Sequence, residues 1–240
     1  MSHTAGEFLQ AGGGKNVSDQ VKGYLRRTLV MLPAVPLMAL GISLCVFGNL
    51  GSDPFTAFQQ GIGNLSGLQV GDVSMICNVS IVVAFIFIDR KMVNVGSVIF
   101  AFCTGPCINF FNGVIRSIAG AEFATSWVAY LYPVIGNLLI TLALAYYLPI
   151  DLGIQALDML SLTVGERMLK KTYGIGLYII YAVMFALALL MKAPWGFGTL
   201  VSILLVGKGV DLLKPRLTPM VYKLAGMGPP QVYAVEEEGQ

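Results

Sequence analysis

The chain has 240 residues, of which 56% are hydrophobic and 12% are charged, whereas soluble domains carry about 25% charged residues. Because this number of charged side chains is too small to cover a water-facing surface, we expect most of the chain to lie in lipid. The net charge of +2 is too small for a nucleic-acid-binding surface, and nucleic acid is excluded as a partner.

Six apolar runs each approach the roughly 20 residues that cross about 30 Å of hydrocarbon. The chain is therefore expected to be an all-α integral membrane protein with about six transmembrane helices. The segments 1–24 and 217–240 are expected to be cytoplasmic tails, the first of them disordered. The predicted spans are 28–48, 73–89, 93–113, 127–148, 174–191 and 197–213.

The distribution of basic residues predicts the orientation of the chain in the membrane. With six spans, 13 of the 15 Lys and Arg residues lie on the same side as the amino terminus. Arg116 and Lys192 are the two on the other side. This asymmetry predicts that both termini are cytoplasmic.

A shift of 102 residues aligns the chain with itself, which predicts two membrane repeats over 25–116 and 124–216. Each repeat contains three spans, and an odd number of crossings inverts the second copy. Inverted repeats are frequent in secondary transporters, whose binding sites lie near mid-membrane where the halves meet. The aligned pairs are Leu50-Gly51 with Leu152-Gly153, Gly96-Ser97 with Gly198-Thr199, Gly105 with Gly207, and Asn109 with Asp211.

A short helix is predicted over 53–66, between the first two spans. Asp53 is a good N-cap, and Pro54 suits the first helical turn. At about 21 Å the helix is too short to span the membrane, so we expect a re-entrant half-helix. One face is apolar and the other is polar, and the polar face needs a cover of protein or of a water-filled cavity. The residues of the polar face are Thr56, Gln59, Gln60, Gly63 and Asn64.

The equivalent segment of the second repeat, 154–168, places Gln155, Asp158 and Gly165 on one helical face. Its far end carries several charged residues and is expected to be wetter. The sequence leaves open an eight-span arrangement in which both short segments cross the membrane. Their length and polarity favour six spans.

The run Leu50-Gly51-Ser52-Asp53-Pro54-Phe55, followed by Gly67-Leu68-Gln69-Val70-Gly71, resembles the bacterial YczE/YitT family of small multi-pass inner-membrane proteins. The likeness covers about 38–115 well and the remainder weakly. The second half has Gln155-Ala156 where the repeat would place Asp-Pro. The resemblance implies a membrane location and a fold, and it names no substrate.

The single histidine, His3, and the four cysteines argue against an enzyme, a cofactor and a metal site. Cys103 and Cys107 share a helical face, but no histidine or further nearby cysteine completes a zinc site with them. Without a histidine in the body of the chain, Ser-His and Cys-His catalytic pairs are excluded. We expect no enzyme activity, no cofactor and no bound metal.

Ionisable and amide side chains at membrane depth are costly unless they are paired or serve a pathway. The presence of such side chains in the predicted membrane segments indicates a secondary transporter or channel for a small polar solute or ion. The alternative is a membrane-embedded binding, accessory or regulatory subunit without transport of its own. The partners are the lipid bilayer and the solute, and a homo-oligomer stays open. The predicted solute-binding residues are Asp53, Thr56, Gln59, Gln60, Asn109, Gln155 and Asp158.

Overall fold

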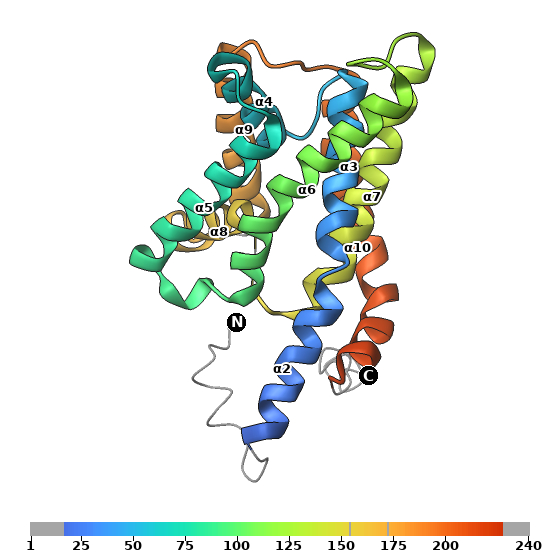
Figure 1. Ribbon diagram of the computed structural model, residues 1–240. Coiled ribbons are helices and arrows are strands. Elements are labelled where there is room, and N and C mark those ends of the chain that lie inside the picture. Colours follow the sequence, from blue (N-terminus) through green and yellow to red (C-terminus); the bar gives the residue numbers. More distant parts are fainter. Residues whose placement is uncertain (1–16, 154, 172, 228–240) are drawn as a thin grey trace, which may run out of the picture.

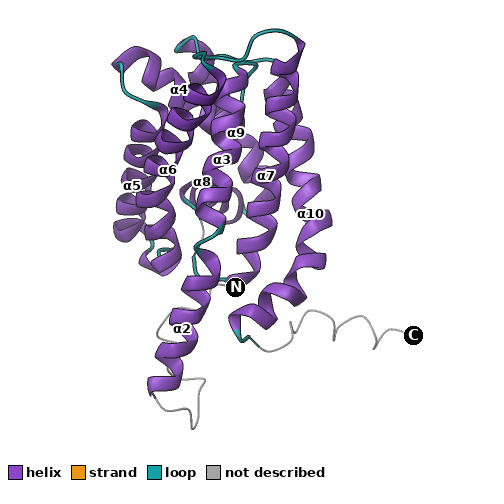
Figure 2. Ribbon diagram, turned by 45° about the vertical axis from the view of Figure 1, so that its right-hand side comes forward, coloured by secondary structure: helices purple, strands orange, loops and turns teal. Residues whose placement is uncertain are grey.

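The computed structural model describes residues 17–153, 155–171 and 173–227, and every regular element in these ranges is a helix (Figure 1, Figure 2). The predicted all-α fold is confirmed for the described residues. Short 3-10 turns and one π-helical turn, η4 (Thr163–Met168), join the longer helices. The α-helices are α2 (Val17–Met31), α3 (Ala34–Gly48), α4 (Pro54–Ser66), α5 (Val70–Ile88), α6 (Val95–Ala119), α7 (Leu131–Tyr147), α8 (Ala156–Leu162), α9 (Tyr173–Leu190) and α10 (Phe197–Ala225).

Four helical stretches are long and apolar enough to cross a membrane. The shortest has 19 residues and reaches about 28 Å at about 1.5 Å per residue. In α9 and α10 the described apolar parts, Ile175–Leu190 and Phe197–Val206, are shorter. The four stretches are Val21–Gly48, Val70–Ile88, Val95–Ala119 and Trp127–Ile150.

Both ends of the described chain are more helical than the sequence predicted. The predicted disordered tail, 1–24, contains the start of α2, and the tail 217–240 contains the end of α10. Arg26 of α2 explains the ordered end of α10, because its Nε donates to the Leu224 carbonyl at 2.7 Å. A basic side chain thus satisfies a carbonyl left free at a helix C-terminus. The remaining tail residues, 1–16 and 228–240, lie outside the described residues.

The antiparallel helices α3 and α7 form the centre of the bundle, with α6 packed on α3 and α10 packed on α7 (Figure 1). Glycines allow this close approach. A Cβ on Gly41 would lie 2.6 Å from the Gly136 carbonyl oxygen, and a Cβ on Gly136 would lie 2.5 Å from that of Gly41. Small residues at helix crossings are typical of membrane proteins, where van der Waals contact drives association.

Two hydrogen bonds tie the connection after each central helix to a distant helix start. The Gly198 amide donates to the Leu50 carbonyl at 2.8 Å, and the Gly96 amide donates to the Leu152 carbonyl at 2.9 Å. The 102-residue shift aligns Leu50 with Leu152 and Gly96 with Gly198. The two bonds therefore join equivalent pairs of positions.

The backbone around these carbonyls is alike in both places. Asn49 and Asp151 adopt left-handed conformations, with φ of 51° and 53°. Gly51 and Gly153 follow, with φ of 94° and 116°, values that favour glycine. The equivalence therefore extends from the sequence to the local conformation and its hydrogen bonds.

The connections gather at two ends of the bundle. Those at 67–69, 120–126 and 191–196 lie at one end, which we call the Lys192 end (Figure 1). Those at 89–94 and 148–153 lie at the other, which we call the Arg90 end (Figure 1). The short helix α4 lies near the Lys192 end, and α8 lies closer to the Arg90 end than α4 does (Figure 1).

Gly136→Val is expected to destabilise the protein by about 1–3 kcal/mol, because the new methyl groups overpack the α3–α7 crossing. Gly113→Val is the matched control, since a Cβ on Gly113 of α6 meets no atom within 4 Å. Thermal unfolding of both variants in detergent measures the difference. Equal midpoints for the two variants would show that this crossing does not limit stability.

Candidate functional site

Asp53 caps α4 as the sequence predicts. Its Oδ1 accepts hydrogen bonds from the amides of Phe55 at 3.1 Å and Thr56 at 3.0 Å, and Pro54 follows at the first helical position. These bonds satisfy amides that have no partner within the helix. Burial raises the pKa of the Asp53 carboxyl above its ordinary value, whereas the two amide bonds favour the carboxylate and act in the opposite direction.

Most of the predicted polar face of α4 is covered by protein. Thr56, Gln59 and Gln60 are only 3%, 2% and 5% exposed, whereas Asn64 near the C-terminal end of the helix is exposed. On the predicted apolar side Phe55 is 8% exposed and Leu65 is 71% exposed. The helix is therefore buried along its first turns and becomes exposed in its last turn.

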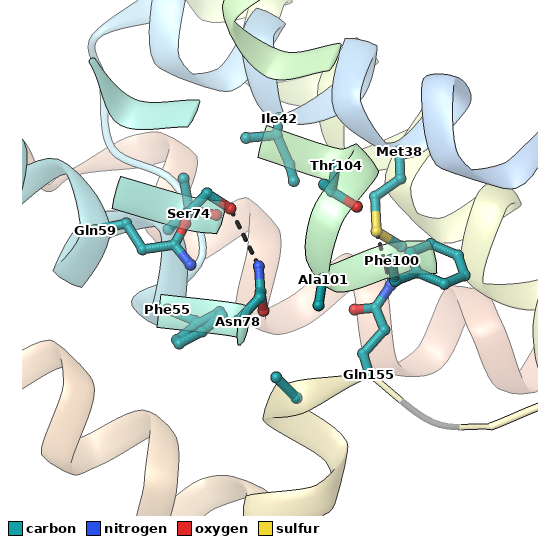
Figure 3. A pocket seen from close by; sticks show the side chains of 12 residues that line it. Met38, Ile42, Phe55, Gln59, Ser74, Asn78, Phe100, Ala101, Thr104 and Gln155 are labelled. Atoms are coloured by element: carbon teal, nitrogen blue, oxygen red, sulfur yellow. Dashed lines mark hydrogen bonds between the residues drawn. The ribbon is translucent and has the colours of Figure 1, made fainter. Parts of the chain in front are cut away.

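A small cavity of about 40 Å³ lies beside α4, and we call it the central cavity (Figure 3). Gln59, Ser74 and Asn78 approach it from one side, and Met38, Phe100 and Gln155 from the other (Figure 3). The side chains come from α3, α4, α5 and α6 and from the start of α8. The lining residues are Met38, Ile42, Phe55, Thr56, Gln59, Ser74, Asn78, Phe100, Ala101, Thr104, Gln155 and Ala156.

The lining of the central cavity combines apolar side chains with uncharged polar ones. Asn78 Nδ2 donates to Ser74 Oγ at 3.2 Å, and Gln155 Nε2 lies 2.9 Å from Met38 Sδ (Figure 3). Hydroxyls and amides both donate and accept hydrogen bonds, so the lining suits a neutral polar guest. A single buried water needs about 10–15 Å³, so the cavity is large enough for water or for a solute of a few heavy atoms.

A second cavity of about 690 Å³ lies at the Lys192 end, and we call it the vestibule. Helix α4 contributes to both cavities, since Gln59 lines the central cavity and its neighbour Gln60 lines the vestibule. Ser52 Oγ donates to Gln60 Oε1 at 3.3 Å and orients that amide. The vestibule is lined by Val46, Asn49, Gln60, Gly63, Asn64, Gly67, Leu68, Gln69, Val70, Asn112, Arg116, Glu122, Phe123, Lys192 and Pro194.

The structure brings together some of the predicted site residues and separates others. Thr56, Gln59 and Gln155 line the central cavity, and Asp53 caps the helix that carries the first two. Gln60 belongs to the vestibule instead.

Asn109 lies in neither cavity. Its Oδ1 accepts from the Gly71 amide at 2.9 Å, and its Nδ2 donates to Asp72 Oδ1 at 2.7 Å. Asn109 therefore fastens α6 to the first turn of α5, where an amide needs an acceptor. Its role in solute binding stays a prediction.

Asp158 lies outside the lining of both cavities and accepts a long hydrogen bond of 3.4 Å from the Tyr147 hydroxyl. Asp158 therefore does not line the site.

Ser74, Asn78 and Thr104 line the central cavity although they were not among the predicted site residues. Ser74 and Asn78 lie four residues apart and therefore share a face of α5. The sequence feature that could have revealed them is a pair of polar residues, one helical turn apart, within an apolar span.

The described residues contain no group of three or more His, Cys, Asp or Glu side chains that would hold a metal ion. Cys103 is exposed and Cys107 is half-buried, and both are free thiols. The site that the structure offers is therefore built from hydroxyl and amide groups.

Long apolar helices around a buried polar cavity define a helical membrane protein. The chain belongs to DUF6198, a family of unknown function, whose model matches residues 25–215. No solved structure matches the chain.

Two proteins of Bacillus subtilis (strain 168) are similar to the chain. The uncharacterized protein YyaS is 29% identical over 179 residues, which are 75% of this chain and 88% of YyaS. The uncharacterized membrane protein YczE is 27% identical over 172 residues, which are 71% of this chain and 77% of YczE. The predicted resemblance to a YczE-type family is confirmed.

Asp53→Ala is expected to lower stability by about 1 kcal/mol, because the first turn of α4 loses its cap. Asp53→Asn retains an acceptor of equal capping strength and serves as the matched control. Thermal unfolding in detergent compares the two variants with the parent chain. If Asp53→Asn loses as much stability as Asp53→Ala, the carboxylate charge is the stabilising feature and the cap is not.

Proposed function

We propose that the chain is a secondary transporter for a small polar solute, which passes between the vestibule and the central cavity along the polar face of α4. The observation that carries this proposal is the burial of three polar side chains of α4, of which Thr56 and Gln59 line the central cavity and Gln60 lines the vestibule. Polar side chains at membrane depth are costly, and a solute pathway gives them a role. The proposal includes no enzyme activity and no cofactor.

The transporter is proposed to consist of two inverted three-span repeats. In this arrangement α3, α5 and α6 cross the membrane in the first repeat and α7, α9 and α10 in the second, while α4 and α8 are re-entrant. The hydrogen bonds from Gly198 to Leu50 and from Gly96 to Leu152 support the repeat, because they link equivalent positions reciprocally. Short helices at a repeat interface are a recurring feature of transporter binding sites.

The proposed orientation places the Arg90 end in the cytoplasm, together with both termini, in a bacterial inner membrane. Basic residues concentrate at the Arg90 end. Arg116 and Lys192, the two cations of the vestibule lining, lie at the Lys192 end. The positive-inside rule therefore supports the assignment. The vestibule then opens to the outside.

We propose that an ion pair at the Arg90 end holds this end closed. Arg167 of η4 pairs with Asp89 at the C-terminal end of α5, and their side chains are 52% and 12% exposed. The pair links the two proposed repeats below the central cavity. Alternating access requires this contact to break, and η4 is a π-helical turn, a feature that often marks functional positions.

Flux through purified protein in liposomes tests the proposal. A panel of small polar solutes is first screened for thermal stabilisation in detergent, since a ligand that binds the folded state raises its stability. The stabilising solute is then followed into liposomes with and without the protein. Protein-dependent uptake supports the transporter, and binding without uptake supports the accessory-subunit alternative.

Thr104→Val is expected to reduce uptake by up to about tenfold, because it removes a hydroxyl from the central cavity at nearly constant volume. Thr28→Val is the matched control, since Thr28 lies on α2 and its hydroxyl bonds only the Tyr24 carbonyl. Initial uptake rates at equal protein amounts provide the measurement. Equal rates for both variants would remove Thr104 from the pathway.

Arg167→Gln is expected to open the Arg90 end and to raise, several-fold, labelling of a cysteine at position 104 in a Cys-free background. An impermeant maleimide added from that end measures the labelling rate. The double change Asp89→Arg with Arg167→Asp should restore the slow rate, because it rebuilds the pair with exchanged charges. A double variant that labels as fast as Arg167→Gln would argue against the ion pair as the closing contact.

A further inference from the structure

The vestibule contains a combination of groups that the solute pathway alone does not explain. Arg116 projects from α6 and Lys192 from the connection between α9 and α10, and both line this one cavity. In the proposed orientation they are the two basic residues of the outer side, while 13 of the 15 lie inside. Two cations that go against the charge bias of the chain therefore meet at one site.

The two cations of the vestibule are exposed side chains that are not neutralised by ion pairs within the described part of the chain. Arg116 lies 5.8 Å from the centre of the Phe123 ring, a contact that orients the guanidinium. Among the described residues neither Arg116 nor Lys192 forms an ion pair. Glu122 is the one carboxylate in the lining, so the cavity has a net positive charge.

Two buried amides complete the donor set. Asn112 is only 9% exposed, and no described protein group hydrogen-bonds its side chain. Gln60 is 5% exposed, and Ser52 holds its Oε1, which leaves its Nε2 for a ligand. Both amides line the vestibule, where their N–H groups are able to donate to a bound acceptor.

We propose that the vestibule binds a small soluble anion that carries a carboxylate or phosphate group. This inference rests on the proposed function, because it assigns the transported solute to the class of organic or inorganic anions. Guanidinium and ammonium groups supply charge-assisted hydrogen bonds to such a group, and the amides of Asn112 and Gln60 supply further donors. The volume of about 690 Å³ falls in the range of small-molecule sites.

Tryptophan fluorescence provides a direct binding assay. The chain has two tryptophans, and Trp195 follows Pro194 of the vestibule lining. In a Trp127→Phe background, Trp195 reports on sodium phosphate and sodium succinate, titrated in detergent at constant ionic strength. Choline chloride and glycerol are the cationic and neutral probes. Phosphate or succinate is expected to give a saturable change, and choline and glycerol are expected to give none.

Charge variants assign the response to the vestibule. Arg116→Gln and Lys192→Gln are each expected to weaken anion binding about tenfold, and Glu122→Gln is expected to strengthen it. Lys91→Gln is the matched control, because it removes the same charge at the Arg90 end. Unchanged affinity in both Arg116→Gln and Lys192→Gln would overturn the proposal.

Two further outcomes overturn the proposal and separate it from the transporter itself. A response to phosphatidylglycerol in mixed micelles, with none to soluble phosphate or succinate, would assign the vestibule to a lipid headgroup. Protein-dependent uptake of a neutral solute without anion binding would leave the transporter intact and remove the anion. Anion binding without uptake of any solute would instead preserve the site and reject transport.

Discussion

The structure depends on one constraint: polar groups at membrane depth must find partners inside the protein, because lipid offers none. The chain leaves its helices at several points within the bundle, and each departure is satisfied locally. The Leu50 and Leu152 carbonyls accept from distant glycine amides, and Asp53 accepts from the first turn of α4. These contacts allow irregular backbone to lie between long apolar helices.

The same constraint shapes the cavities. A buried polar face on a short helix requires either protein partners or a polar space, and α4 uses both. Gln60 is held by Ser52 at the edge of the vestibule, while Thr56 and Gln59 face a small neutral chamber among five helices. The two cavities differ in charge as well as size, so a solute would meet cations first and uncharged groups afterwards.

Features encoded by neighbouring residues could be predicted from the sequence, and features encoded by packing could not. Asp53-Pro54 predicts the start of α4 because an N-cap acts on amides two and three residues away. The hydrogen bonds of Asn109 could not be predicted, because its partners, Gly71 and Asp72, are set by the α5–α6 contact. Ser74 and Asn78 were missed because a polar residue in a span looks the same whether it bonds a neighbouring helix or lines a cavity.

Helix α9 has a consequence for motion. It packs against α4, against α8 and against η4, so it touches both short helices and the turn that carries Arg167. A rigid tilt or slide of α9 therefore changes the contacts of both short helices together, which makes this helix a mechanical linkage between the Lys192 end and the Arg90 end of the bundle.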